Sequence, residues 1–530
     1  MVKMKKTAYI TTPIYYASGE VHIGNAYTTI AADAFARYNR LVGRDTFYLT
    51  GMDEHGLKIE EAAKKNKMEP QAFVDKIAEE TKATWKDLKI SYDYFIRTTD
   101  DCHVKAVQGI FEKLLKQGDI YLGKYEGNYC MSCEAFFSDS QLVDKVNCPD
   151  CGRPTTLLDE ESYFLKLTKY ADRLLKHIED HPDFIQPESR KNEVVSFIES
   201  GLEDLCVSRQ SFKWGVPVLC NPNHVVYVWI DALSNYITAL GYGSSDTSNY
   251  EKYWINGTET IHIIGKDILR FHAVYWPIMI FALGEPVNFK VYTHGFILMK
   301  DDKMSKSKDN FVYPHEIIDA YGLDSLRYYL LREMPFGNDS SFTYERFIDR
   351  YNSDLANDLG NLVSRTVSMV NKYFGGSVSY KDANDEHSKE LKDLVEKVSE
   401  NYQNHFSKFH IQEAIIEAFS LVSRANKYVD EMAPWVLAKS EDKKDVLEEA
   451  MYHLLETIRI VNILLSPVLV DAVEDIKEIL NLSKKDLKFK NITFGYLKEY
   501  KIKEKAKILY KRLDKEKELQ FQEERLKNRK

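Results

Sequence analysis

The four residues His22-Ile23-Gly24-Asn25 have the types needed to bind a phosphate group at the start of a helix. A helix N-terminus offers free backbone N–H groups and the positive end of its dipole to an anion. Gly24 would let a flat nucleotide approach the backbone because it has no Cβ. His22 could donate a hydrogen bond to a phosphoryl oxygen as charge develops. A lone histidine at a helix start is more often an ordinary packed residue, so the motif needs a second phosphate-binding element beside it.

The pentapeptide Lys303-Met304-Ser305-Lys306-Ser307, in the polar segment 301–310, supplies such an element. Two lysines on a mobile loop can move onto a triphosphate and neutralise it as pyrophosphate leaves. Alone, this loop would be interpreted as solvated. Paired with the helix start, it resembles the two signatures of class I aminoacyl-tRNA synthetases, which make an aminoacyl-adenylate from ATP and then transfer the aminoacyl group to tRNA.

Four cysteines have the spacing of a zinc site. Cys130 and Cys133 form one pair with two residues between them, and Cys148 and Cys151 form a second. Each pair places two thiolates on one edge of a tetrahedron, so the two pairs complete the coordination of one structural Zn²⁺ per chain. A small cysteine-rich insertion has little core of its own and would depend on the metal. Cys102, Cys206 and Cys220 lack this spacing, and we predict that they are buried thiols.

The elements that would position these residues are typical of a doubly wound α/β domain. Residues 7–16 predict a strand, the apolar positions between 26 and 41 predict a helix, and residues 46–50 predict a second strand, which together make a βαβ unit. Further strands are predicted at 225–230, 260–264 and 290–292. From residue 354 onward we predict helices only, with the charged tail beyond Lys484 forming a solvated helix.

Length and composition exclude several classes of protein. The chain has 530 residues, which is too many for one core and predicts about three or four domains. No apolar stretch approaches the ~20 residues of a membrane span, and the N-terminus lacks the apolar core of a signal peptide, so we predict a cytoplasmic protein that binds no membrane. The net charge of -9 excludes a uniformly basic surface of the kind that binds DNA.

These features together narrow the resemblance to the methionyl-tRNA synthetase family, over essentially the whole chain. Besides the motifs above, the residues that carry it are Thr12-Pro13-Ile14-Tyr15-Tyr16, Asp53-Glu54-His55-Gly56, Tyr227-Val228-Trp229-Ile230-Asp231-Ala232, Gly265-Lys266-Asp267-Ile268, Phe271-His272, 357–365 and Asp430-Glu431-Met432-Ala433-Pro434-Trp435. One position departs from the family pattern. The first motif usually ends in histidine, whereas this chain has Asn25, which can donate to a phosphate but carries no charge.

The resemblance implies a Rossmann-like catalytic domain with a zinc-binding insertion, followed by an all-α helical-bundle domain that binds the anticodon. We expect the first catalytic half at 1–119, the connective insertion with its four-cysteine zinc knuckle at 120–212 and the second catalytic half at 213–298. A mobile lysine-loop and stem-contact region would follow at 299–353. The anticodon-binding domain and its charged tail would occupy 354–530.

The resemblance also implies roles for single residues. The methionine side chain would be bound by Ile14, Tyr16, Trp229, Tyr236, Phe271 and His272, and Asp53 would hold the substrate ammonium group. ATP would be bound by His22, Gly24, Asn25, Asp267, His294 and Lys306, of which Asp267 holds the ribose. His22, Gly24, Asn25, Lys303 and Lys306 would form the catalytic set. Asn361, Arg365 and Trp435 would contact the anticodon.

The implied reaction joins L-methionine to tRNA(Met), including initiator tRNA, and uses ATP with Mg²⁺. The methionine carboxylate attacks the α-phosphorus, and a hydroxyl of the terminal adenosine then takes the methionyl group. No side chain acts as a nucleophile, so catalysis is positioning and electrostatic stabilisation. We expect a monomer. A different class I synthetase, a small nucleotidyltransferase and a catalytically silent tRNA-binding paralogue stay open as alternatives.

Overall fold

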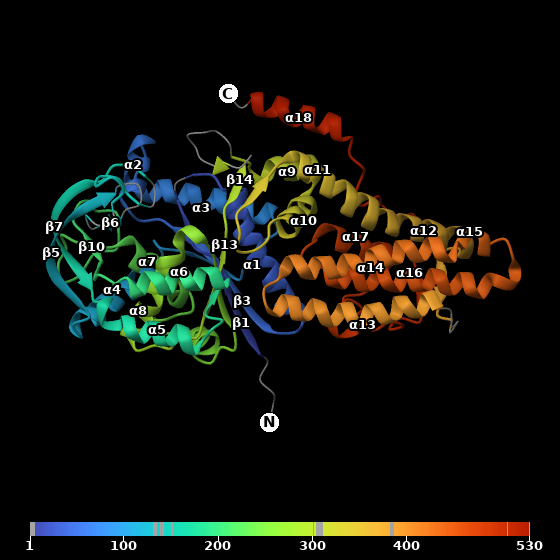
Figure 1. Ribbon diagram of the computed structural model, residues 1–530, viewed down its shortest axis with the longest axis horizontal. Helices are drawn as coiled ribbons and strands as arrows, with labels where there is room; N and C mark the ends of the chain where they lie inside the picture. The colour runs from blue at the N-terminus through green and yellow to red at the C-terminus, as the bar shows by residue number, and fades with distance from the viewer. Residues whose placement is uncertain are drawn as a thin grey trace.

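A computed structural model provides the structure of the chain (Figure 1). It describes residues 6–17, 19–130, 135–137, 139, 142–149, 152–299, 302–303, 311–381, 386–505 and 507–528. Cys133, Cys151, Lys306 and the side chain of Lys303 lie outside this described part of the chain. Within it, no helix combines the length and the apolar character that crossing a membrane requires.

A seven-stranded parallel sheet forms the centre of the catalytic part. Its order is β2-β3-β1-β12-β13-β8, with β4 also paired to β3. The strands are β1 (Thr7–Thr11), β2 (Tyr15–Tyr16), β3 (Asp45–Asp53), β4 (Tyr94–Arg97), β8 (Ile185–Gln186), β12 (Thr260–Gly265) and β13 (Lys290–His294). Every residue of β1 is buried, as expected of a central strand covered on both faces. The order reverses between β1 and β12, and this reversal defines the point where ligands bind in doubly wound sheets.

Helices cover both faces of this sheet. They are α1 (Ile23–Leu41), α2 (Leu57–Lys65), α3 (Pro70–Asp87), α4 (Asp101–Lys116), α5 (Ala171–Asp180), α6 (Glu188–Glu199), α7 (Val228–Thr238) and α8 (Trp276–Leu283). Alternate residues of β1 serve different cores, because side chains of a strand point to opposite faces. Ala8 and Ile10 pack in the core with α1, whereas Tyr9 packs in the core with α4, α7 and α8.

An antiparallel sheet follows the first catalytic half. Its order is β6-β5-β7-β9, with β5 (Ile120–Cys130), β6 (Ala135–Phe137), β7 (Thr156–Leu165) and β9 (Leu205–Cys206). A separate pair, β10 (Ser208–Arg209) and β11 (Val225–Val226), leads back to the catalytic part. Strand β8 falls within the range 120–212 that is predicted to be the insertion, yet it pairs with β13 of the catalytic sheet.

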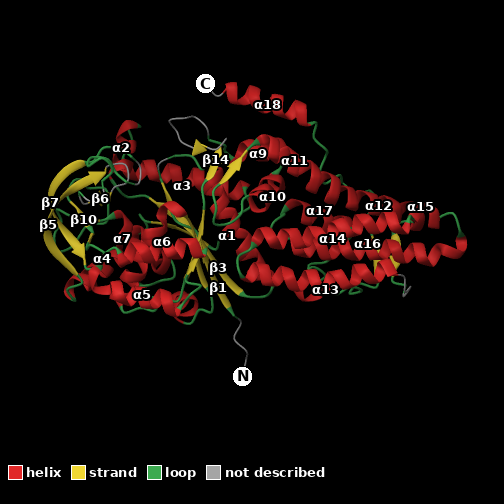
Figure 2. Ribbon diagram, viewed as in Figure 1, coloured by secondary structure: helices red, strands yellow, loops and turns green. Residues whose placement is uncertain are grey.

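Helices dominate the rest of the chain (Figure 2). A connecting region holds the strands β14 (Ile297–Met299), β15 (Asp302–Lys303) and β16 (Ser340–Phe342), with the helices α9 (Pro314–Tyr321), α10 (Leu323–Glu333) and α11 (Tyr344–Arg350). The C-terminal bundle contains a π-helical segment (Tyr351–Gly360), α12 (Asn361–Phe374), α13 (Glu386–Ser407), α14 (Ile411–Met432), α15 (Pro434–Leu437), α16 (Lys444–Leu465) and α17 (Asp471–Ile479). The parallel catalytic sheet and the helical C-terminal part confirm the predicted fold class.

Several predicted elements differ from the observed ones. The strand predicted at 7–16 is divided into β1 and β2, since Pro13 has no N–H to donate to a ladder. The strand predicted at 225–230 is wrong: only β11 is extended, and α7 begins at Val228. The prediction of helices alone beyond 354 is also wrong, because β17 (Ser377–Ser379) pairs with β18 (Glu499–Lys501).

The prediction of a solvated charged tail needs correction too. Its last element, α18 (Lys515–Asn528), lies against α9 and α11 (Figure 1). Tyr321 of α9 donates to the Glu518 carboxylate over 3.0 Å and accepts from the Gln522 amide over 2.8 Å. Gln522 is only 2% exposed. This polar helix therefore docks by satisfied hydrogen bonds as well as by Leu519 and Leu526, which pack against the apolar core.

Candidate functional site

A cavity of about 500 Å³ opens at the carboxyl ends of β1 and β12, where the strand order reverses. Among the residues predicted for methionine and ATP, those that line it are Ile14, Tyr16, His22, Gly24, Asn25, Asp53, Trp229, Tyr236, Asp267, His272 and His294. The fold thus gathers into one space residues that lie far apart in the sequence. Phe271 is not among the lining residues.

Aromatic side chains form one wall of the cavity. Trp229 of α7 lies flat on Phe271, with ring centroids 3.6 Å apart and an angle of 10° between the planes. Phe271 therefore packs on one face of the Trp229 indole without itself lining the cavity. Phe271 and His272 belong to a π-helical segment, Phe271–Tyr275, that precedes α8, and such segments often occur at functional sites. This wall is apolar and polarizable.

The hydrogen-bond partners of His272 show which of its ring nitrogens carries the proton. Its Nδ1 lies 2.9 Å from the carbonyl oxygen of Ile268, which can only accept, so Nδ1 carries the hydrogen. Its Nε2 then accepts from the Tyr236 hydroxyl at 2.7 Å. Burial lowers the pKa of His272 to about 4, so the ring is neutral at physiological pH. A neutral, fully engaged histidine keeps this end of the cavity uncharged.

The start of α1 is held by the predicted phosphate motif itself. The Gly24 N–H donates to Nδ1 of His22 over 3.0 Å, and the His22 N–H donates to Oδ1 of Asn25 over 3.3 Å. These two bonds form a reciprocal cap on the helix N-terminus. Because Nδ1 accepts, the neutral His22 ring carries its proton on Nε2. Asn25 is thus engaged in capping α1, a role beyond the phosphate contact predicted for it.

Two glycines permit close contacts at the nucleotide end. A Cβ on Gly24 would lie 2.8 Å from Cε1 of His22, so only glycine leaves room for the capping ring. A Cβ on Gly265 would lie 2.6 Å from Oδ1 of Asp267. Asp267 can therefore fold back toward the end of β12. His294, at the end of β13, donates from Nδ1 to the Gly295 carbonyl over 2.7 Å and accepts at Nε2 from the Thr28 hydroxyl over 2.6 Å.

Some residues of the site were not found from the sequence. Phe311 lines the cavity and packs on His22 with ring centroids 4.8 Å apart. Lys58 of α2 also lines it, with its ammonium 5.7 Å from the centre of the Tyr16 ring. No spacing or motif indicates either residue, since each reaches the cavity only through the packing of its segment.

A buried network of polar side chains holds α7, the helix that contributes Trp229 to the aromatic wall. The carboxylate of Asp231 lies 2.6 Å from Nδ1 of His55 and 2.8 Å from Nε2 of His103. Burial opposes the charge on Asp231, but the two histidines outweigh it and lower its pKa. His55 and Asp231 stand in motifs that carry the family resemblance, although neither has a predicted role. Their contact connects the end of β3 to the helix that carries Trp229.

The two cysteines of the predicted zinc site that the structure describes lie together. Cys130 ends β5 and Cys148 stands in a turn, and both side chains are buried in one small cluster. Two buried thiols from separate segments fit half of a tetrahedral site. The described residues contain no group of three or more metal-binding side chains. Of the other cysteines, Cys206 is buried as predicted, but Cys102 and Cys220 are exposed, so that prediction is wrong for them.

The three residues predicted to contact an anticodon lie in the C-terminal bundle. Asn361 and Arg365 are on α12, and Arg365 donates to Asp430 at the end of α14 over 3.1 Å. Trp435 is on α15 and is 46% exposed. The indole is therefore not a core residue. The ion pair brings Arg365 to the corner where α14 ends and Trp435 follows.

Comparison with known families agrees with this geometry. Residues 8–159 and 151–367 match the family "tRNA synthetases class I (M)". Residues 379–529 match "Anticodon binding domain of methionyl tRNA ligase". The doubly wound sheet, the cavity at its reversal point and the helical bundle are thus those of a class I tRNA synthetase.

Individual relatives identify the branch of this class. The chain is 51% identical to the methionine–tRNA ligase of Caldanaerobacter subterraneus subsp. tengcongensis, over 97% of this chain and 80% of that protein. It is 52% identical to that of Enterococcus faecalis, over 98% of this chain and 79% of that protein. A solved structure of Mycobacterium tuberculosis methionyl-tRNA synthetase bound by methionyl-adenylate superposes with a TM-score of 0.91, at 38% identity and over 95% and 100% of the two chains. The chain belongs to the methionyl-tRNA synthetase family.

Proposed function

We propose that the chain is a methionine–tRNA ligase that activates L-methionine with ATP and transfers it to tRNA(Met), including initiator tRNA. The observation that carries this proposal is the cavity, which joins a capped helix start to an uncharged aromatic wall in one space of about 500 Å³. A helix start suits phosphates, and an apolar, polarizable wall suits a thioether. No observation on the chain favours a different class I synthetase or a silent paralogue.

In the first step the chain orients methionine and ATP. The side chain of methionine packs against Trp229, with Tyr236 and His272 holding the end of the compartment neutral. Asp53, buried at the end of β3, accepts the substrate ammonium group. His22 donates from Nε2 to the phosphates as charge develops, and Asp267 accepts from the ribose hydroxyls. Mg²⁺ bound to the incoming ATP would supply neutralisation of the phosphate charge.

We assign the departure of pyrophosphate to the lysine loop. Lys306 neutralises the leaving phosphates, and Lys303 assists it. The described residues on either side of the loop support the assignment, because β14 begins at the cavity residue Ile297 and pairs with β15 at Asp302–Lys303, and Phe311 lines the cavity. In the second step a hydroxyl of the terminal adenosine attacks the carbonyl of the adenylate, the bond from that carbonyl carbon to the phosphate oxygen breaks, and AMP leaves. Asn361, Arg365 and Trp435 bind the anticodon, with the exposed indole as a stacking surface.

We further propose that Cys130, Cys133, Cys148 and Cys151 bind one structural zinc ion. Four thiolates leave no open position on the metal, so its contribution is to fold the tip of the antiparallel sheet. The burial of Cys130 beside Cys148 supports this. We also expect a cytoplasmic monomer that binds neither DNA nor membranes, and a sedimentation mass near 61.6 kDa would agree with the monomer.

The test is ATP–pyrophosphate exchange with each of the twenty amino acids in turn, followed by charging of tRNA(Met). We expect exchange with methionine alone. A His22→Gln variant, purified in the same way, should lose most of this exchange, which excludes a contaminating host enzyme as its source. Exchange with another amino acid would keep the class and overturn the methionine pocket. Silence with all twenty, in folded and zinc-loaded protein, would favour the tRNA-binding paralogue.

A further inference from the structure

Helix α10 carries two buried charged side chains at the place where the catalytic part meets the C-terminal helices. Asp324 is 4% exposed and Arg327 is 0% exposed. They stand on one face, about one helical turn apart. Burying a charge costs free energy unless the charge is fully paired. The partners of Asp324 and Arg327 therefore show which segments these two residues hold together.

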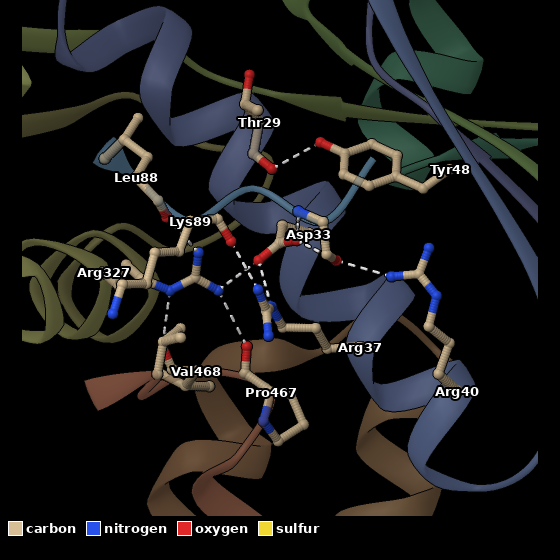
Figure 3. Close-up of polar contacts among 12 residues, drawn as sticks. Thr29, Asp33, Arg37, Arg40, Tyr48, Leu88, Lys89, Arg327, Pro467 and Val468 are labelled. Atoms are coloured by element: carbon tan, nitrogen blue, oxygen red, sulfur yellow. Dashed lines mark hydrogen bonds and ion pairs between the residues drawn. The ribbon is translucent and has the colours of Figure 1, made fainter. Parts of the chain in front are cut away.

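Arg327 joins three segments that are distant in the sequence. Its Nη2 donates to Oδ2 of Asp33 on α1 over 2.7 Å and to the Pro467 carbonyl over 3.2 Å. Its Nε donates to the Val468 carbonyl over 2.8 Å, and its Nη1 donates to the Leu88 carbonyl over 3.4 Å. In Figure 3 the guanidinium lies between Asp33 and the carbonyls of Pro467 and Val468, which belong to the corner between α16 and α17. One planar group thus links the catalytic helix α1 to the bundle.

Asp324 binds the other half of the same corner. Its carboxylate accepts from the N–H of Val470 over 2.6 Å, from that of Asp471 over 3.1 Å and from that of Ala472 over 2.6 Å. These N–H groups form the N-terminus of α17, where a negative charge is favourable. Helix α10 therefore holds the residues 467–472 with opposite charges, a cation on the carbonyls and an anion on the N–H groups.

Asp33 connects Arg327 to α1, the helix that begins at the phosphate motif. Its carboxylate also accepts from Nε of Arg37 over 2.7 Å and from the Ser91 N–H over 2.7 Å. Burial would raise the pKa of Asp33, but the charges of Arg327 and Arg37 outweigh it and keep the carboxylate ionised. From His22 to Asp33 is roughly 16 Å along a single helix. The orientation of the bundle is thereby tied to the helix that forms the nucleotide end of the cavity.

We propose that Arg327 is a positioning residue for aminoacyl transfer, because it holds the corner 467–472 of the bundle at a fixed orientation to α1. The inference rests on the proposed function. A tRNA held by its anticodon at Trp435 must deliver its other end to the cavity, so a small rotation at the junction displaces that end by a larger distance. Misplacing a reacting group by about 1 Å can cost about 10²-fold in rate. Methionine activation does not depend on this orientation.

The experiment uses the full chain with Arg327→Lys, which keeps a charge beside Asp33 but cannot span the four partners of the guanidinium. Three quantities are measured: methionine-dependent pyrophosphate exchange, binding of a tRNA(Met) anticodon stem-loop, and charging of full-length tRNA(Met). We expect exchange and stem-loop binding within about twofold of the wild type and charging reduced roughly tenfold in kcat, within the usual range of coupling between sites. Arg37→Gln is the matched control. It touches the same Asp33 but no residue of the corner, so all three quantities should stay within about twofold.

Asp324→Asn provides a second variant, because it weakens the hold on the N-terminus of α17 and leaves Arg327 in place. It should show the same pattern, and it decides the question if Arg327→Lys does not fold. Parallel loss of exchange and charging would indicate a merely structural residue and overturn the proposal. Unchanged charging in both variants would also overturn it. Absence of charging by the wild type would instead refute the proposed function.

Discussion

The histidines of the cavity differ in which nitrogen holds the proton, and their neighbours decide this. His22 accepts at Nδ1 from the Gly24 N–H and so presents an N–H at Nε2. His272 and His294 donate from Nδ1 to backbone carbonyls and accept at Nε2 from the hydroxyls of Tyr236 and Thr28. His22 therefore has the protonation that its proposed phosphate contact requires, whereas burial lowers the pKa of His272 and His294 and holds both rings neutral in the wall.

Gly24→Ala adds only one methyl group, but we expect it to displace the His22 ring from its capping position. The new Cβ would lie 2.8 Å from Cε1 and 2.9 Å from Nδ1 of His22, so the ring must leave its capping position. We expect kcat of pyrophosphate exchange to fall about 10²-fold, as for other misplaced catalytic groups. Steady-state exchange kinetics measure this.

The matched control for this variant is Gly109→Ala, in the middle of α4. A Cβ there meets nothing within 4 Å. Alanine should leave exchange unchanged and stabilise the helix by ~1 kcal/mol. Equal kinetics of the two variants would show that the contact between Gly24 and His22 has no part in catalysis.

His272 should make stability depend on pH. Burial lowers its pKa from the ordinary 6.5 to about 4 in the folded protein. Below pH 6.5 the unfolded chain therefore binds a proton that the folded protein does not, and stability falls as the pH falls toward 4. Between pH 7 and pH 5.5 this amounts to roughly 1 kcal/mol. Urea unfolding at these two pH values should show a smaller loss of stability for His272→Gln than for the wild type; an equal loss would contradict the assignment.

Among the elements, α7 shows how a buried segment can be misassigned. The run Val225-Val226-Tyr227-Val228-Trp229-Ile230 is β-branched and aromatic, which favours a strand. Almost every residue of α7 is buried, so the helix has no solvent-exposed face, and its polar residues at helical spacing, Asp231, Ser234, Asn235 and Thr238, come only after the run that favours a strand. The consequence for the site is direct, since Trp229 reaches the cavity from the first turn of a helix.

The proposed zinc site belongs to the antiparallel insertion. We expect one zinc ion per chain in the wild type and a loss of zinc in Cys148→Ser, which removes one of four ligands. Cys102→Ser, at an exposed cysteine outside the paired spacing, should retain the metal. Atomic emission on purified protein measures the content. Equal zinc in both variants would refute the assignment of Cys148 as a ligand.

For the molecule as a whole, one apolar core continues from the catalytic part into the bundle. Phe35 and Tyr38 of α1 lie in the same core as Tyr402 and Phe406 of α13, and Tyr38 stacks on Phe406 at 4.3 Å. The bundle is thus not a domain on a loose linker. This apolar contact and the polar junction at Arg327 restrain the same helix, α1.

The last helix, α18, docks against α9 of the connecting region. Tyr321→Phe removes the hydroxyl that binds both Glu518 and Gln522. We expect the docking of α18 to weaken by about 1–2 kcal/mol. Hydrogen exchange of the amides in 515–528 should become correspondingly faster, as followed by mass spectrometry.

The control for this variant is Lys517→Ala, whose side chain is 80% exposed and pairs with Asp514 within the same segment. Exchange in this variant should match the wild type. If Tyr321→Phe also left exchange unchanged, other contacts of α18 would have to hold it in place.

Local sequence patterns were enough to predict the class of fold and the family, and most residues predicted for methionine and ATP line one cavity. Motifs such as His22-Ile23-Gly24-Asn25 and the paired cysteines are local, because their chemistry depends on spacing within a few residues. The alternation of strands and helices was readable for the same reason. Strands were predicted at 7–16 and 260–264, and the structure has β1 and β12 there, on the two sides of the reversal point.

Long-range packing, in contrast, selects the residues that complete the site and the way in which the parts are joined. Phe311 and Lys58 reach the cavity through neighbours that are remote in sequence, so no local pattern indicates them. His55 and Asp231 stand in recognisable motifs, but only the tertiary structure shows that they pair. The same holds for Arg327, whose partners lie in α1 and beyond α16. Hydrogen bonds and buried charges are satisfied by whichever group the fold brings near. That choice belongs to the three-dimensional arrangement and not to the order of residues along the chain.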